Sequence, residues 1–273
     1  MTSADKVFAG NIPTIYQQCL VPMIFEPYAQ EMADRASRLR PKKILEIAAG
    51  TGVVTRALVG KLENTAEIVA TDLNQPMLDT AALLHAGNGM VTFRQADAQS
   101  LPFEDESFDI AVCQFGVMFF PDKQRSYSET LRVLKPGGTY LFAVWDRLST
   151  NEFVTVASAV LAQRFPDDPP KFMERTPYGY YDTEMIINAL KQVGFAEAFA
   201  ETVDKIATAK TALDAATGYC QGNPLGAEIE ARAAGSLQSV TEEVAAGLAE
   251  RFGHGQIEGK IRAHIITARK QPK

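Results

Sequence analysis

Cysteine and histidine are scarce in this sequence. The 273 residues include three of each, and no two cysteines form a CxxC pair. Cys19, Cys113 and Cys220 are odd in number and far apart, which argues against a disulfide framework and against a cysteine zinc site. We therefore expect no disulfide and no bound metal.

An excess of basic charge and a long apolar run are also missing. The formal net charge is -6, which argues against the extended basic surface that binds the phosphates of nucleic acid. No run of about 18 apolar residues could span a bilayer, and the N-terminus lacks the basic and then apolar order of a signal peptide. The sequence predicts a cytoplasmic protein with no membrane span and no nucleic-acid partner.

Short apolar runs alternate with amphipathic stretches from Lys42 to about Trp145. This order is typical of βα units and of a mostly parallel sheet, so the fold class is α/β. The predicted strands in this part of the chain are residues 43–48, 68–71, 91–96, 108–114 and 139–145.

Capping residues and glycines mark the predicted helices. Asp122 is expected to cap a helix through Leu134, followed by a sharp reversal at residues 135–138, where Pro cannot continue a helix and Gly permits the turn. Asp182 or Thr183 is expected to cap another helix. The predicted inner face of that helix consists of Met185, Ile186, Ala189, Leu190 and Val193.

A glycine turn follows the first predicted strand. Gly50-Thr51-Gly52 lets a ligand approach the backbone and directs helix N–H groups at negative charge. The dinucleotide fingerprint needs a third glycine where Thr55 stands, which disfavours a nicotinamide oxidoreductase. A carboxylate after the second strand, Asp72, is well placed to accept ribose hydroxyls, and one after the third, Asp97, to accept from an exocyclic amine.

Five ordered segments resemble class I S-adenosylmethionine-dependent methyltransferases. They are residues 44–52, 70–73, 96–103, 108–112 and 133–138. Leu101-Pro102-Phe103, followed by the fourth-strand segment, is similar to the ubiquinone and menaquinone biosynthesis type, which acts mainly on small molecules. The resemblance implies a Rossmann-like seven-stranded sheet of order 3-2-1-4-5-7-6, with the last strand antiparallel, helices on both faces and a lid.

The expected organisation is a single methyltransferase domain over residues 1–273. Residues 42–145 are its cofactor-binding core, and residues 1–30 are an N-terminal lid segment. Residues 146–181 are rich in proline and aromatic side chains and too long for an ordinary connection, so we expect a lid insertion there. Residues 182–273 complete the sheet, with extra helices and a last strand at 260–269.

The resemblance also implies a set of cofactor contacts. The ribose is expected at Asp72, the adenine at Asp97 and Ala98, and the methionyl ammonium at Glu46 through water. For Tyr16, cofactor contact and simple packing are equal alternatives, and Met77 either flanks the adenine or packs inside its helix. The predicted cofactor-binding residues are Tyr16, Glu46, Ala48, Gly50, Thr51, Gly52, Asp72, Leu73, Met77, Asp97, Ala98, Gln114 and Phe115.

The reaction implied is transfer of a methyl group from S-adenosylmethionine, with S-adenosylhomocysteine as product, to a small organic acceptor. In-line displacement depends mainly on alignment in a dry site. The sequence marks no catalytic base, and we expect His85 and His264 to be structural or surface residues. The alternative is a non-catalytic S-adenosylmethionine-binding or regulatory protein of the same fold. The expected partner is a small-molecule acceptor, and a homodimer stays open.

Overall fold

The computed structural model describes residue 8 and residues 10–62 and 65–273. The chain divides into two compact units. The first consists of residues 1–27, 145–180 and 204–262, and the second of residues 28–144, 181–203 and 263–273. The division into a single domain with two lid segments stays a prediction.

The described residues contain a seven-stranded sheet of order β3-β2-β1-β4-β5-β7-β6, as the sequence predicts. β1 pairs in parallel with β2 and β4, and β2 with β3 and β4 with β5 do the same. β7 is antiparallel to β5, because Lys270 N donates to Gly138 O and Asp146 N donates to Arg262 O. The strands are β1 (Lys43–Ile47), β2 (Glu67–Asp72), β3 (Val91–Gln95), β4 (Phe108–Gln114), β5 (Leu134–Trp145), β6 (Glu197–Ala209) and β7 (Ile257–Arg269).

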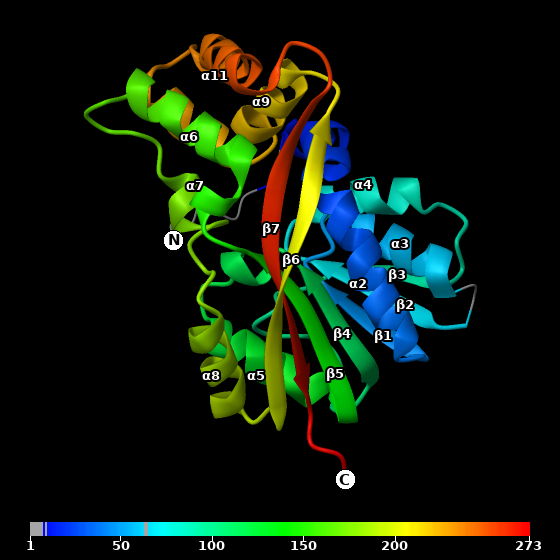
Figure 1. The fold of residues 1–273 in the computed structure, drawn as a ribbon. Coiled ribbons are helices and arrows are strands. Elements are labelled where there is room, and N and C mark those ends of the chain that lie inside the picture. Colours follow the sequence, from blue (N-terminus) through cyan, green and yellow to red (C-terminus); the bar gives the residue numbers. More distant parts are fainter. Residues whose placement is uncertain (1–7, 9, 63–64) are drawn as a thin grey trace. The chain divides into compact units, whose positions relative to one another are not determined.

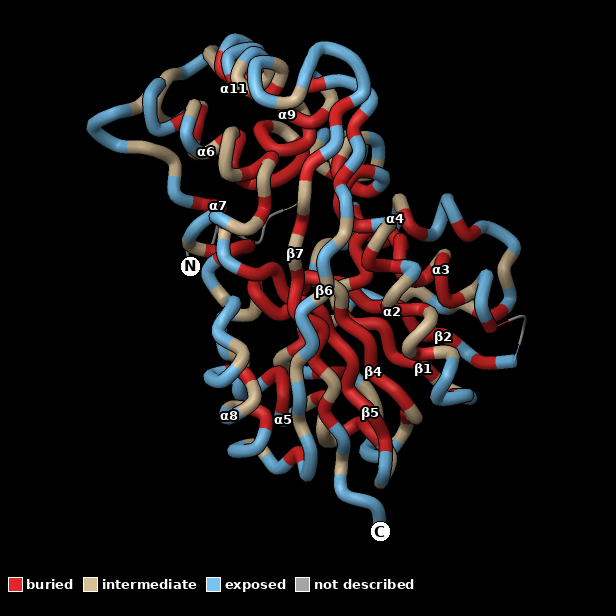
Figure 2. Tube along the Cα trace, in the orientation of Figure 1, coloured by how far each residue is buried: buried red, intermediate tan, exposed pale blue. Residues whose placement is uncertain are grey.

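Burial separates the middle of the sheet from its edges (Figure 2). β1 and β4 are buried along most of their length, whereas β3 and most of β6 are half-buried or exposed. Strands covered on both faces need apolar residues throughout, which explains the nearly continuous apolar run of β4.

Helices flank the sheet within the second unit. Figure 1 shows α5 and α8 side by side next to β4 and β5, and the two helices are in contact. α2 and α3 are joined by an ion pair from Lys61 Nζ to Asp34 Oδ1 of 2.7 Å. The helices are α2 (Glu26–Arg38), α3 (Val53–Leu62), α4 (Gln75–Leu84), α5 (Lys123–Val133) and α8 (Thr183–Val193).

Capping by the predicted residues is confirmed in α5 and α8. Asp122 accepts a hydrogen bond from Arg125 N, and Asp182 accepts one from Met185 N. The predicted inner face of α8 is only partly correct. Ile186 and Leu190 are buried, but Met185 is exposed, because its neighbours at the start of the helix face solvent.

The predicted end of the helix before residues 135–138 is confirmed, but these residues are part of a strand and not a separate turn. α5 ends at Val133, and these residues belong to β5 as a bulge where the register with β4 shifts. Gly137 has φ +74°, and Gly138 leaves no room for a Cβ, which would lie 2.7 Å from Lys135 O. Glycine therefore serves a bulge in the strand instead of a turn between helix and strand.

The first unit is mainly helical. It contains a π-helix of ten residues, η2, which the sequence does not predict. Residues 146–181, the predicted lid insertion, contain three helices, and Tyr178 is buried against Trp145. The elements of this unit are α1 (Ile12–Ile15), η2 (Tyr16–Phe25), η4 (Leu148–Thr150), α6 (Glu152–Arg164), α7 (Phe172–Arg175), α9 (Ala212–Gln221), α10 (Leu225–Arg232) and α11 (Leu237–Phe252).

None of the helices in the described residues has the length and apolar character needed to cross a membrane.

Candidate functional site

The carboxyl ends of four adjacent parallel strands carry nearly all of the predicted site residues. Glu46 of β1 stands opposite Ala70 of β2 and Val112 of β4, and Asp72 stands opposite Gln95 of β3. The sheet therefore brings the segments after β1, β2, β3 and β4 to one edge, where ligands of open α/β sheets bind.

The glycine turn after β1 has an unusual backbone. Ala48, Gly50 and Gly52 have φ values of +56°, +57° and +81°. Ala49 N donates to Thr71 O over 2.8 Å, which ties the turn to the end of β2. A left-handed alanine is strained, and such strain persists only where the surroundings impose it, often at functional sites.

Asp72 is buried beside this turn with 8% of its surface exposed. Its Oδ2 accepts from Gly50 N over 2.9 Å, and its Oδ1 accepts from Asn74 N over 2.8 Å. Burial raises the pKa of Asp72, although these hydrogen bonds act in the opposite direction. Oδ1 also accepts from Asn74 Nδ2 over 3.4 Å, so the acceptor position that stays open on Asp72 is on Oδ2, which can receive a hydroxyl group.

Glu46 is more deeply buried than Asp72, with 2% of its surface exposed. Thr55 Oγ1 donates to Glu46 Oε2 over 2.6 Å. Burial raises the pKa of Glu46 to about 8, and the nearby Asp72 adds to the shift. Glu46 is therefore mainly protonated at neutral pH, and a cation bound nearby would favour its charged form.

The segment after β4 packs directly on the glycine turn. Phe115 is buried and left-handed, with φ +56°. A Cβ on Gly116 would lie 2.5 Å from the Cβ of Ala48. Only glycine fits at position 116, and the turns after β1 and β4 are consequently in close contact. Gln114, the last residue of β4, is half-buried.

The predicted adenine residues differ in exposure. Asp97 is exposed and accepts from Gln99 N over 2.9 Å, while Ala98 is buried. Leu73 is 42% exposed and is available to a ligand, whereas Met77 is buried within α4 at 4%. The burial of Met77 favours the packing alternative for that side chain.

Tyr16 belongs to the other unit. Its ring stacks on Phe25 with ring centroids 4.9 Å apart, and Phe8 packs edge-on against it. Cofactor contact by Tyr16 stays a prediction.

Two residues of α5 hold residues 96–103, the predicted adenine segment, and are absent from the predicted set. Glu129 Oε2 accepts from Leu101 N over 2.8 Å. Arg132 donates from Nη2 to Leu101 O and from Nη1 to Phe103 O, over 2.9 and 2.7 Å. The sequence signal for these two residues was their spacing, with Arg132 three positions after Glu129 on one helix face. Such pairs are common on solvent-exposed helices, so the spacing does not single them out.

The residues of the second unit thus form a strained glycine turn with two buried carboxylates and a neighbouring loop fixed by α5. The family model that matches residues 45–142 is the methyltransferase domain. The resemblance predicted from the five segments is confirmed. The matched residues include the glycine turn, Asp72, Asp97 and the end of β4.

A curated relative in Pseudomonas aeruginosa, the ubiquinone/menaquinone biosynthesis C-methyltransferase UbiE, is 40% identical over 112 residues. This match covers 40% of this chain and 44% of the relative. The chain therefore matches less than half of the relative's length, and the similarity does not extend over the whole of either protein.

Solved structures extend the similarity at the level of the fold. A Haemonchus contortus phosphoethanolamine N-methyltransferase in complex with S-adenosylhomocysteine has a TM-score of 0.65 at 17% identity, covering 100% of this chain and 61% of its own. The cyclase SpnF has a TM-score of 0.55 at 20% identity, covering 91% of this chain and 82% of its own. Because one of these two structures is a cyclase, the fold alone does not determine the reaction.

Proposed function

We propose that this protein binds S-adenosylmethionine and transfers its methyl group to a small organic acceptor. The observation that carries the proposal is Asp72, a buried carboxylate bonded to the N–H of Gly50 at the edge where the methyltransferase family model matches. S-adenosylmethionine carries the methyl group on a positively charged sulfur. The acceptor would attack the methyl carbon in line with that sulfur, and S-adenosylhomocysteine would leave.

The described residues fit this cofactor. Thr51 Oγ1 is buried in the glycine turn and has no hydrogen-bond partner in the described part of the chain. A buried hydroxyl of this kind costs free energy unless a ligand or water satisfies it. The acceptor position that stays open on Asp72 Oδ2 suits a ribose hydroxyl, and Asp97 suits an exocyclic amine.

Glu46 provides for the positive end of the cofactor. A carboxyl with a pKa of about 8 is close enough to neutral pH to lose its proton when an ammonium group binds nearby. The ammonium would contact Glu46 directly or through water, and the proton would leave to solvent. Affinity for the cofactor should then increase as the pH rises toward 8.

The acceptor is not carried over from the curated relative, because the match leaves residues outside the cofactor-binding part uncompared. The name of that relative directs the first acceptor screen to quinol-type rings. The acceptor site is proposed to involve residues outside 42–145.

Calorimetry with S-adenosylhomocysteine and S-adenosylmethionine tests the proposal. We expect both to bind with micromolar affinity and nicotinamide dinucleotides to show no binding. A second assay follows transfer of a labelled methyl group to a panel of small aromatic, amine and hydroxyl acceptors. Absence of binding by either sulfur compound would overturn the proposal, and binding without transfer to any acceptor would favour the non-catalytic alternative.

A further inference from the structure

His85 closes α4 and contacts the glycine turn. The residue is buried, and its Nε2 lies 3.2 Å from Gly52 O. The same oxygen accepts from Arg56 N over 2.9 Å, which is the first backbone bond of α3. A carbonyl oxygen only accepts hydrogen bonds, so His85 must donate from Nε2.

The imidazole fills a space that only glycine leaves open. A Cβ on Gly52 would lie 3.0 Å from His85 Nε2 and 3.3 Å from Ala81 Cβ. On its other side the ring packs against Phe93 of β3, with ring centroids 5.8 Å apart. The histidine is therefore wedged between the glycine turn, α4 and β3.

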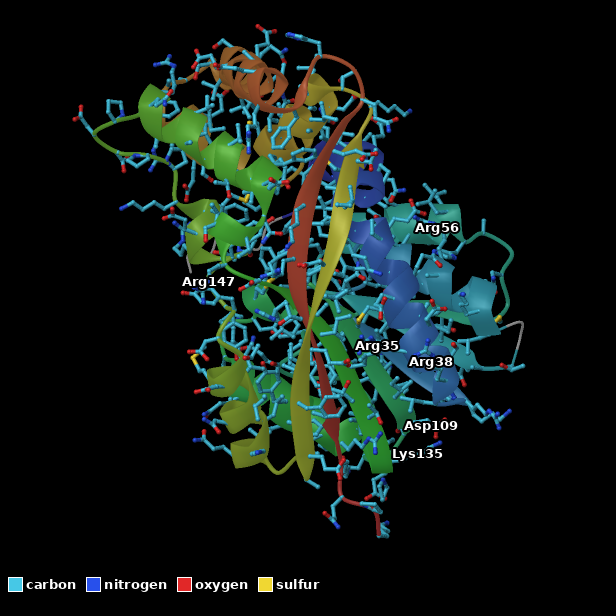
Figure 3. The ribbon with its side chains drawn as sticks, viewed as in Figure 1. Arg35, Arg38, Arg56, Asp109, Lys135 and Arg147 are labelled. Carbon is cyan, nitrogen blue, oxygen red and sulfur yellow. The ribbon has the colours of Figure 1, made fainter. Side chains whose placement is uncertain are left out.

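Arg56 of α3 is the charged group that faces this imidazole among the described residues. Burial lowers the pKa of His85, the hydrogen bond to Gly52 acts in the opposite direction, and Arg56 lowers it further. Phe93, which packs against the ring, is uncharged. His85 is thus neutral at pH 7, with its proton on Nε2. Arg56 is labelled in Figure 3.

Two side chains hold the same turn through opposite groups. Asp72, which precedes α4, accepts from the N–H of Gly50, and His85, which follows α4, donates to the carbonyl of Gly52. Gly50 and Gly52 both have positive φ values, and ordering a glycine backbone costs more conformational entropy than ordering any other residue. Without these bonds the turn would have other conformations available.

We infer that His85 is a positioning residue, which holds the Gly52 peptide in the orientation that cofactor binding requires. This inference rests on the proposed function and adds to it a residue outside the five segments that resemble class I methyltransferases. The bond from Nε2 acts through the turn, so no contact between His85 and the cofactor is involved.

Two variants separate the hydrogen bond from the packing of the ring. His85→Phe fills the space without a donor, whereas His85→Gln places an amide N–H near the position of Nε2. Leu83→Ala, at a residue of α4 that is 80% exposed, is the matched control. We expect S-adenosylhomocysteine to bind His85→Phe at least about tenfold more weakly, as expected for one lost hydrogen bond. His85→Gln should remain within about threefold of the wild type.

Amide hydrogen exchange across residues 46–60 of the free protein gives a readout that needs no cofactor. We expect faster exchange in His85→Phe and wild-type exchange in His85→Gln and Leu83→Ala. Unchanged exchange and affinity in His85→Phe overturn the inference. If the wild type does not bind S-adenosylhomocysteine, the proposed function fails, and the exchange measurement still decides the role of His85.

Nuclear magnetic resonance of the wild-type imidazole nitrogens covers the case in which neither variant folds. The proton should reside on Nε2 at pH 7. A proton on Nδ1 would overturn the inference, because Nε2 could not then donate to Gly52 O.

Discussion

Two aspartates at opposite ends of the parallel strands show how different one residue type becomes in two surroundings. Asp72 ends β2, is buried and accepts from N–H groups, and no ion pair reaches it in the described part of the chain. Asp109 lies at the start of β4, where it accepts from the N–H groups of Lys42 and Lys43 and pairs with Lys135 Nζ at 2.7 Å. Figure 3 shows Asp109 and Lys135 next to each other at that end.

The shifts of the two carboxyl groups are opposite in direction. Burial raises the pKa of Asp72 more than its hydrogen bonds lower it. At Asp109, burial acts in the same direction, but the bond from Lys135 and the two N–H groups outweigh it and lower the pKa. The hydrogen bonds and the ion pair of Asp109 are made within the protein and support the fold. Asp72 is buried with an acceptor position unused, which costs free energy, and this is typical of a group that binds a ligand.

The largest effect is expected from Asp72→Ala. Loss of a hydrogen bond from a ligand to a charged carboxylate corresponds to about 3 kcal/mol at most, or roughly a hundredfold in affinity. S-adenosylhomocysteine should therefore bind up to about a hundredfold more weakly, and the free energy of unfolding should fall as well, because the N–H groups of Gly50 and Asn74 lose their acceptor. Calorimetry and chemical denaturation measure the two quantities. Asp79→Ala, at an exposed aspartate of α4, is the control and should bind as the wild type does.

Arg132→Lys should have the next largest effect on binding. Lysine keeps the charge but lacks the fork that reaches both Leu101 O and Phe103 O. We expect S-adenosylhomocysteine affinity to fall by about tenfold, which corresponds to loss of one charge-assisted hydrogen bond. Ser128→Ala, on an exposed face of the same helix, controls for changes in α5. Full affinity in Arg132→Lys would show that the adenine segment needs no support from this arginine.

Glu46→Gln tests the other buried carboxyl through pH. The folded protein holds a proton on Glu46 up to a pKa of about 8, whereas the unfolded chain releases it near 4.5. The free energy of unfolding should therefore fall as the pH rises from about 5 to 8.

Glutamine at position 46 removes this titration. Between about pH 5 and 8 the free energy of unfolding should therefore fall less in Glu46→Gln than in the wild type, and the two decreases should differ by more than about 1 kcal/mol. Urea denaturation at several pH values measures the difference. Parallel curves for the wild type and Glu46→Gln would contradict the raised pKa of Glu46. The variant should also lose the increase of cofactor affinity toward pH 8.

Asp109→Asn should have the smallest effect and leave binding intact. The pair with Lys135 is largely solvated, so its loss is expected to cost about 0.5 kcal/mol. Because the pKa of Asp109 is lowered, its contribution is present above the usual value of 3.8 and is lost as the pH falls below it. Denaturation at pH 7 and pH 3 checks this, and a change in S-adenosylhomocysteine affinity would remove the contrast with Asp72.

The strand order followed from the resemblance to class I methyltransferases and not from periodicity. The edge where Asp72 and Glu46 meet was predicted because parallel strands with helical connections bring their carboxyl ends together. The sequence could not predict the bulge at residues 135–138, since Pro and Gly after a helix indicate a reversal as readily as an irregular strand start. The π-helix over Tyr16–Phe25 also left no signal, because its apolar residues suit an α-helix equally well.

The residues that support the candidate site from outside the sheet edge were harder to predict. Arg132 and His85 act on main-chain carbonyls of distant segments, and the sequence does not specify which loop a helix side chain will meet. The division into two units depends on long-range contacts among segments far apart in the chain, which periodicity within each segment does not encode.

The close approach of Ala48 and Gly116 has a consequence for how this chain can change. A Cβ at position 116 would lie 2.5 Å from the methyl group of Ala48 and 2.8 Å from Cys113 Sγ. Positions 48 and 116 therefore compete for the same space, although they are 68 positions apart in the sequence. Among related chains, a larger residue at one of these positions should be accompanied by glycine at the other, and the double substitution Ala48→Gly with Gly116→Ala should be tolerated better than Gly116→Ala alone.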